Sequence, residues 1–196
     1  MNASAEQPVR AAFIDRDGVI NVEHNYVHRI EDFELIEGVP EGLAQLAAAG
    51  YKLVVVTNQA GIARGFYTVA DMDRLHEHLR TELAARGVQI DAIYHCPHHP
   101  QGKIPEYAIA CDCRKPAPGM LLQAARELNL DLSASVLVGD KISDIEAGRA
   151  AGVRMAVLVR SGHSFDGAAE ALADAVADDL RAAAETIVKM NTGVSP

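Results

Sequence analysis

The chain has 196 residues, of which 49% are hydrophobic and 23% are charged, and its formal net charge is −9. This composition is typical of one globular domain with enough apolar residues to fill a core. The acidic balance argues against a nucleic-acid-binding or membrane-surface protein, because the long-range field repels phosphate backbones and anionic headgroups. We therefore expect a single domain over residues 1–196, with no nucleic-acid and no membrane partner.

The expected elements follow one another as short apolar runs that alternate with helix-like segments. In chain order the expected strands are Ala11–Ile14, Leu53–Val56, Ile90–Tyr94, Val136–Val138, Met155–Val159 and a weaker one at Ala173–Ala177. The expected helices are Gly38–Ala49, Pro118–Leu128 and Asp178–Met190, together with one that begins near Val69 and ends at Gly87. A further helix is expected to begin with a capping box formed by Ser143 and Glu146 and to end by Gly152. Thr68 with Asp71 predicts a capping box at the start of the second helix. This alternation is typical of a doubly wound parallel α/β sheet.

The apolar segments and the cysteines of the chain indicate the cellular compartment in which the protein acts. No apolar run approaches the roughly 18 residues that span a bilayer, and MNASAEQPVR lacks the apolar stretch of a signal peptide. We therefore expect a cytoplasmic protein, and we expect it to act as a monomer. The three cysteines, Cys96, Cys111 and Cys113, are an odd set that lies close together. Such a set favours metal binding over disulfide pairing.

One long segment, His95–Pro118, is rich in proline, cysteine and histidine and has little periodicity, which predicts a functional or stapled loop. Three sulfurs and one imidazole are the ligand set typical of a closed structural zinc site. The candidate ligands are Cys96, His98, Cys111 and Cys113, with His95 and His99 as competing candidates for the imidazole. A zinc ion there would stiffen the loop that carries Arg114 and Lys115.

Polar residues follow directly after several of the apolar runs. The segments are Asp15-Arg16-Asp17-Gly18, Thr57-Asn58-Gln59, Arg114-Lys115-Pro116 at the end of the long loop, and Gly139-Asp140-Lys141. Each alone is common in a turn or a helix cap. In an open parallel sheet, however, ligands bind beyond the carboxyl ends of the strands. The four segments together therefore predict one shared site.

The residue types at this predicted site suit phosphoryl transfer. On an extended backbone Asp15 and Asp17 would project to one side, roughly 6–7 Å apart. One carboxylate could attack phosphorus while the other protonates the leaving oxygen. With Asp140 they offer oxygen ligands for Mg²⁺. Lys115 and Thr57 could stabilise the charge on the phosphoryl oxygens. The sequence thus predicts a magnesium-dependent phosphatase.

The same motifs, together with Asp144, resemble those of the haloacid dehalogenase-like phosphatases, and the match covers most of the chain. The resemblance implies a Rossmann-like sheet with Asp15 as nucleophile and Asp17 as general acid and then base. It also implies Mg²⁺ held by Asp15, the backbone carbonyl of Asp17, and Asp140. Asp144 would orient Lys115 or the waters of the metal. The chain leaves little room for a large cap domain, so we expect none.

A narrower resemblance is to the branch of this family that removes the 7-phosphate of heptose 1,7-bisphosphate on the route to ADP-heptose and the lipopolysaccharide core. It rests on residues 21–27, 58–65, 96–102 and 111–120. The implied substrate contacts are Glu23, His24, Asn25, Tyr26, Thr57, Asn58, Gln59, Ala60, Arg114, Lys115 and Lys141. The chain departs from the expected pattern at Asn25, in place of glycine, and at Glu23, in place of aspartate. Both departures bear on fine specificity, including the choice of anomer.

Other hypotheses remain at this stage. The chain could be a histidinol-phosphate phosphatase, which would share the catalytic motifs and the zinc loop. It could also be a binding module that is stapled by zinc and has lost its phosphatase activity. A polynucleotide 3′-phosphatase fits the motifs but not the acidic charge. Arg114, with Arg64 as a second candidate, could contact the other phosphate of a sugar bisphosphate. The remaining histidines (His28, His76, His78 and His163) are expected at the surface, and Phe66 and Tyr67 in loop packing.

Overall fold

The structure is a computed structural model that describes residues 9–191. Its centre is a six-stranded sheet of order β3-β2-β1-β4-β5-β6 in which every pair is parallel. The strands are β1 (Arg10–Ile14), β2 (Tyr51–Asn58), β3 (Ala92–Cys96), β4 (Val136–Gly139), β5 (Met155–Val159) and β6 (Ala175–Ala177). The helices are α1 (Val39–Ala48), α2 (Ala60–Arg64), α3 (Val69–Ala84), α4 (Gly119–Glu127), α5 (Ile142–Ala151), α6 (Gly167–Leu172) and α7 (Leu180–Asn191). The predicted α/β fold is confirmed.

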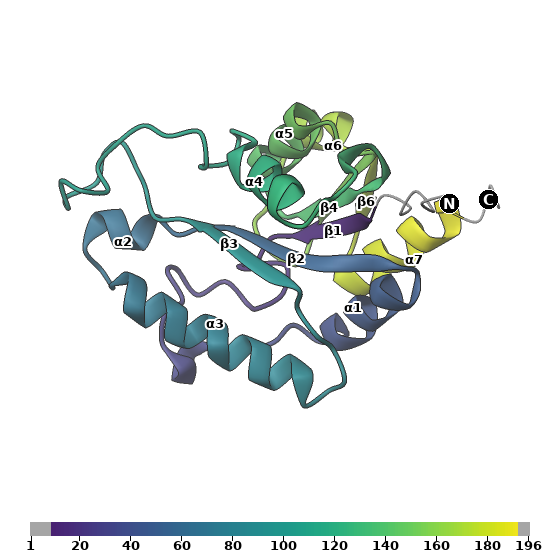
Figure 1. The fold of residues 1–196 in the computed structure, drawn as a ribbon, viewed down its shortest axis with the longest axis horizontal. Coiled ribbons are helices and arrows are strands. Elements are labelled where there is room, and N and C mark those ends of the chain that lie inside the picture. Colours follow the sequence, from purple (N-terminus) through teal and green to yellow (C-terminus); the bar gives the residue numbers. More distant parts are fainter. Residues whose placement is uncertain (1–8, 192–196) are drawn as a thin grey trace, which may run out of the picture.

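Helices cover both faces of the sheet (Figure 1). On one face, Ala12 and Ile14 of β1 share a buried cluster with residues of α1, α3 and α7. On the other face, Ala11 and Phe13 share a cluster with residues of α4 and α5. A strand that is covered on both sides needs apolar residues at every position, which explains the unbroken run Ala11–Ile14.

The chain order explains where the site forms. The chain leaves β1 for β2 and β3 on one side and then returns through α4 to β4 on the other side of β1. The connections diverge at this switch point, so the carboxyl ends of β1, β2 and β4 border an open crevice. Residues 97–118, between β3 and α4, contain no helix or strand, as predicted for the long loop, but His95 and Cys96, predicted as its first residues, belong to β3.

Several predicted boundaries were wrong. β3 begins at Ala92 rather than Ile90, because the Asp91 carboxylate accepts the Leu53 N–H at 2.8 Å in place of a strand partner. α5 is not boxed by Ser143 and Glu146. It begins at Ile142, where Asp144 accepts the N–H of Lys141 at 3.0 Å.

Two short helices, α2 and α6, had no counterpart among the predicted elements, since five or six residues are too few to display a helical period. The capping box at Thr68 and Asp71 is confirmed.

The part of the chain that the structure describes forms the sheet and its covering helices, with no separate cap domain. The single domain was predicted over residues 1–196, and its ends lie outside the described residues. None of the helices within residues 9–191 is long and apolar enough to cross a membrane.

Candidate active site

A cavity of about 490 Å³ opens at the carboxyl ends of the strands, a size suited to a small ligand. Most residues singled out in the sequence line its wall: Asp15, Asp17, Glu23, Asn25, Tyr26, Thr57, Asn58, Gln59, Ala60, Arg114, Lys115 and Lys141. Of the residues predicted for catalysis, magnesium or substrate binding, two are not among the lining residues. Asp140 is completely buried, and His24 is exposed and lies 3.8 Å from Glu34.

The centre of the cavity is a buried ion-pair group around Lys115. Its Nζ lies 3.0 Å from Oδ1 of Asp15 and 2.5 Å from Oδ1 of Asp144, and it donates to the carbonyl of Val56 at 2.8 Å. Burial alone would lower the pKa of Lys115, but the Asp144 and Asp15 carboxylates outweigh it and raise that pKa above its usual range. Lys115 is therefore a permanent positive charge beside Asp15.

Asp15 follows β1, and its carboxylate is fixed by two donors. Oδ1 accepts the N–H of Arg16 at 2.8 Å in addition to contacting Lys115. Burial raises the pKa of Asp15, and the Lys115 ammonium opposes this increase. A carboxylate that is desolvated yet held by a cation is a stronger nucleophile than one in water, because less solvent must be stripped before it attacks.

The position of Lys115 is set by the side chain of Asn58, the last residue of β2. Asn58 Nδ2 donates to the Lys115 carbonyl at 3.0 Å, and Asn58 Oδ1 accepts the Lys115 N–H at 3.0 Å. The amide thus pairs with the loop backbone as a neighbouring strand would. Asn58 was predicted as a substrate contact. It does line the cavity, but both ends of its amide are engaged by Lys115.

Asp17 is held by a buried arginine. Arg16 is fully buried, and its Nη2 donates to both carboxylate oxygens of Asp17, at 2.8 and 2.9 Å. Arg16 Nε and Asn21 Nδ2 also donate to Asp17, each at 3.1 Å, and Gln59 Nε2 donates to it at 3.0 Å. Arg16 also donates to the carbonyl of Val27 at 2.8 Å. Asp17 and Asp15 therefore line one cavity, but Asp17 rests on a rigid hydrogen-bonded support.

His76 of α3 completes this support and corrects the prediction that it lies at the surface. It is buried, and its Nε2 lies 3.0 Å from Nη1 of Arg16. Burial, followed by the charge of Arg16, lowers the pKa of His76 to about 2. The ring is thus neutral, and Nε2 accepts the hydrogen bond from the guanidinium. Sequence periodicity could have found it, since His76 follows Met72 by four residues on the apolar stripe of the helix.

Thr57 belongs to a second hydrogen-bonded chain at the end of β2. Gln59 Nε2 donates to Thr57 Oγ1 at 2.7 Å, and the Tyr67 hydroxyl donates to Gln59 Oε1 at 2.5 Å. Tyr67 was predicted to pack in a loop, and it does pack against Ile62 and Met72, but it also orients Gln59. Because Thr57 accepts from Gln59, its own hydroxyl proton can be donated to a ligand oxygen.

The carboxylates fit a divalent cation. Oxygens of Asp15, Asp140 and Asp144 lie within 4.8 Å of one another, and Oδ1 of Asp140 is buried with no hydrogen-bond partner among residues 9–191. A buried carboxylate oxygen without a hydrogen bond is costly unless a cation binds it, and the Lys141 ammonium lies 3.9 Å away. Carboxylate oxygens are the ligands that Mg²⁺ prefers. Asp15 and Asp140, two of the predicted magnesium ligands, therefore belong to one carboxylate group, in which Asp15 and Asp144 also contact Lys115.

Two neighbours fix Asp140 in place. Its Oδ2 accepts the backbone N–H of His163 at 2.9 Å and lies 2.7 Å from the Nδ1 of the same residue. His163 was expected only at the surface. It is partly exposed, but it lines the cavity, and no sequence motif marks it. At Gly18, whose φ is +85°, a Cβ atom would lie 2.4 Å from Asp140 Oδ2, so only glycine fits there.

The predicted substrate loop has an unusual backbone. Asn25 and Tyr26 have φ angles of 59° and 63°, the left-handed region that non-glycine residues rarely adopt. Glu23 Oε1 accepts the N–H of Asn25 at 2.5 Å, which stabilises this turn. Burial, and then the charge of Asp17, raises the pKa of Glu23. The ring of Tyr26 contacts Phe66 edge-on at 4.9 Å, so this loop packs on the segment that follows α2.

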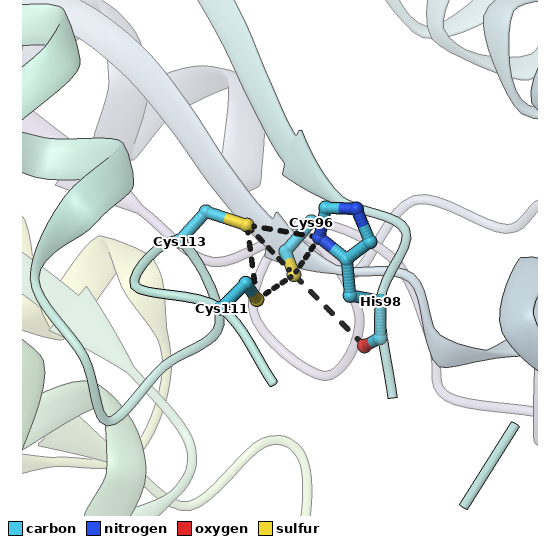
Figure 2. A group of neighbouring side chains, drawn as sticks. All are labelled: Cys96, His98, Cys111 and Cys113. Atoms are coloured by element: carbon cyan, nitrogen blue, oxygen red, sulfur yellow. Dashed lines mark hydrogen bonds between the residues drawn. The ribbon is translucent and has the colours of Figure 1, made fainter. Parts of the chain in front are cut away.

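The cysteines form one cluster between the end of β3, which carries Cys96, and the loop that follows it; Figure 2 shows Cys96, Cys111, Cys113 and His98 pointing toward one another. Their ligand atoms lie within 4.8 Å of one another. The sulfur–sulfur distances are 3.1–3.5 Å, too long for a disulfide, and the three thiols are free. Three sulfurs and an imidazole nitrogen around one point fit a tetrahedral structural zinc.

The choice among the candidate histidines follows from the same geometry. His98 Nδ1 lies 3.3 Å from the Cys113 sulfur, whereas His95 packs near the ring of His76 and His99 Nδ1 accepts the N–H of Gln101. The arginine next to the cluster, Arg114, reaches back to the carbonyl of His98 at 3.4 Å.

Known proteins resemble this chain over most of its length. A HAD-hydrolase-like family model matches residues 112–183. The chain is 51% identical over 174 residues to the D-glycero-β-D-manno-heptose-1,7-bisphosphate 7-phosphatase of Yersinia pestis, covering 89% of this chain and 93% of that protein. It is 50% identical over 181 residues to the protein of the same name from Escherichia coli (strain K12), covering 92% and 95%.

Solved structures agree. The chain superposes on D,D-heptose 1,7-bisphosphate phosphatase from B. bronchiseptica, a complex with magnesium and phosphate, with a TM-score of 0.78 and 31% identity, covering 92% of this chain and 99% of that one. The corresponding enzyme from Burkholderia thailandensis gives a TM-score of 0.63 and 29% identity, covering 91% and 98%. From these identities and coverages, the chain belongs to the D-glycero-β-D-manno-heptose-1,7-bisphosphate 7-phosphatase family of the haloacid dehalogenase-like phosphatases.

Proposed function

We propose that this chain hydrolyses the 7-phosphate of D-glycero-β-D-manno-heptose 1,7-bisphosphate, a step of ADP-heptose and lipopolysaccharide core synthesis. The observation that carries the proposal is the cavity in which Asp15 lies 3.0 Å from the Lys115 ammonium, beside a group of carboxylates that suits Mg²⁺. The relatives that carry this activity in their names match about half of the residues over nine-tenths of the chain.

In the proposed reaction, a carboxylate oxygen of Asp15 attacks the phosphorus atom and forms an aspartyl phosphate. Asp17 protonates the departing 7-oxygen of the sugar and then takes a proton from the water that hydrolyses the intermediate. Lys115 and the Thr57 hydroxyl stabilise the charge on the phosphoryl oxygens. A bound Mg²⁺ would neutralise part of the charge that otherwise keeps an anionic nucleophile away from a phosphate.

The zinc cluster serves this chemistry indirectly. Cys113 precedes Arg114 and Lys115, so a zinc ion bound there fixes the segment that places the catalytic ammonium. Three cysteines close together without a disulfide persist in a reducing compartment, which supports the cytoplasm as the place of action. That the protein acts as a monomer remains a prediction.

The function can be tested by measuring phosphate release with Mg²⁺ from heptose 1,7-bisphosphate and from histidinol phosphate, the main competing substrate. We expect a higher kcat/KM for the bisphosphate, with release from position 7 assigned by NMR of the product. Faster turnover of histidinol phosphate would refute the proposal. Asp15→Asn should abolish turnover while leaving the melting temperature within a few degrees, and residual activity in that variant would exclude the aspartyl phosphate.

A further inference from the structure

Arg64, the last residue of α2, lines the cavity but has no part in the proposed chemistry. Its Nε is buried and has no hydrogen-bond partner within residues 9–191. Other arginines differ in this respect, since Arg149 and Arg160, for example, pair with carboxylates on the surface. A buried donor without an acceptor costs free energy unless a ligand supplies one. The donor set of a guanidinium matches the oxygens of a phosphate.

The surroundings hold Arg64 at one place on the cavity wall. The backbone carbonyl of Ala63 accepts the N–H groups of Lys103 and Ile104 at 2.7 and 3.0 Å, which joins α2 to the zinc loop. On the other side, the Arg64 guanidinium lies 5.9 Å from the centre of the Tyr26 ring. Arg64 therefore sits where the substrate loop, α2 and the zinc loop meet.

Tyr26 is itself in a costly conformation. Its φ of 63° is rare for an aromatic residue, and such strain typically persists where a site requires it. The ring packs edge-on against Phe66, so it is held in position under Arg64 rather than free to turn. A guanidinium that lies over an aromatic ring can still donate hydrogen bonds to a ligand, because its N–H groups point outward in the plane of the guanidinium.

Two cations on the cavity wall differ in how they are compensated. The charge of Lys115 is matched by Asp15 and Asp144, which places it beside the predicted nucleophile for the phosphate that reacts. Arg64, in contrast, lines the same cavity and forms no ion pair with a carboxylate of residues 9–191, and its Nε has no hydrogen-bond partner there. We propose that Arg64, supported by the ring of Tyr26, binds the phosphate that is not hydrolysed. Arg64 would thus determine the preference for a bisphosphate over a monophosphate, an inference that rests on the proposed function.

The test compares two substrates that share the reacting group, heptose 1,7-bisphosphate and heptose 7-phosphate. Arg64→Gln keeps a long polar side chain but removes the charge. We expect kcat/KM for the bisphosphate to fall about 10–100-fold, mainly through KM, because a charge-assisted contact is lost. For the monophosphate, kcat/KM should stay within about twofold of the wild type. Inhibition by the product, heptose 1-phosphate, should weaken by the same factor as the bisphosphate KM.

The matched control is Arg126→Ala, which removes an exposed arginine of α4 that does not line the cavity and should change neither substrate. Melting temperatures show whether Arg64→Gln is folded. Arg64→Lys provides a second variant, which keeps the positive charge but lacks the planar guanidinium. Equal losses on both substrates, or no loss on the bisphosphate, would overturn the role of Arg64. A wild type that releases the 7-phosphate equally well from both substrates would also overturn it. A wild type that does not release the 7-phosphate at all would instead refute the proposed function.

Discussion

Replacing Asn58 with alanine would remove the side chain that holds the Lys115 backbone. Two hydrogen bonds of 3.0 Å would be lost, one to the N–H and one to the carbonyl of Lys115. Each contributes a net 0.5–1.5 kcal/mol in a typical protein, so the pair contributes about 2 kcal/mol. The Lys115 side chain would keep its contact with the Val56 carbonyl, so the residue would be displaced rather than released.

If this free energy is lost mainly from the transition state, kcat falls about 30-fold. The assay is kcat at saturating Mg²⁺ and bisphosphate, together with the melting temperature of each variant. The matched variant is Asn58→Asp, which has the same shape and keeps an acceptor for the Lys115 N–H. It also places an anionic oxygen against the Lys115 carbonyl, so we expect it to be at least as impaired as the alanine variant.

Two results would refute this reasoning. An Asn58→Ala enzyme with unchanged kcat but a lower melting temperature would show that the Asn58 amide stabilises the fold without positioning Lys115 for catalysis. An Asn58→Asp enzyme as active as the wild type would show that the bond to the Lys115 carbonyl is dispensable.

Three further predictions concern the supports of the site. His76 is neutral in the fold but titrates near pH 6.5 when unfolded, so the folded state loses stability as pH falls below 6.5, by about 2 kcal/mol at pH 5. His76→Gln, which keeps an acceptor for Arg16, should show a smaller drop in melting temperature between pH 7 and pH 5; an equal drop contradicts this. Cys111→Ser should lower zinc content, melting temperature and kcat while Mg²⁺ affinity is retained, and unchanged zinc content would exclude Cys111 as a ligand. Asp140→Asn should raise the Mg²⁺ concentration for half-maximal activity at least tenfold, and an unaltered Mg²⁺ dependence would remove Asp140 from the metal site.

The sequence was sufficient to predict the parts of the site that follow strands. Asp15, Thr57 and Asp140 come directly after or at the ends of apolar runs, and parallel strands bring such ends to one edge. The cysteine cluster was predictable for a different reason, since the spacing of three thiols and an imidazole within one loop carries its own geometric meaning. The roles of these residues in catalysis remain predictions that the experiments above address.

What could not be predicted depends on contacts between distant segments. Arg16 lies between two aspartates in the motif, and only the fold shows that it is buried against α3 and Val27. The contact of His163 with Asp140 joins the loops after β4 and β5, and no periodicity or motif marks such a pair. The start of β3 depends on Asp91 and its bond to β2, a local competition that apolar patterning does not record.

The charges on the cavity wall explain why a strongly acidic chain can bind a doubly phosphorylated sugar. The wall carries four carboxylates and four cationic side chains, so the protein alone presents no net attraction for a phosphate there. A net charge of −9 on the whole chain opposes binding further. The fit for a divalent cation at Asp15 and Asp140 therefore serves binding as well as chemistry, because only the added ion makes the site positive. Since Arg64 can face one further anionic group, the arrangement favours a small bisphosphate over polyanions, whose remaining charges the acidic surface repels.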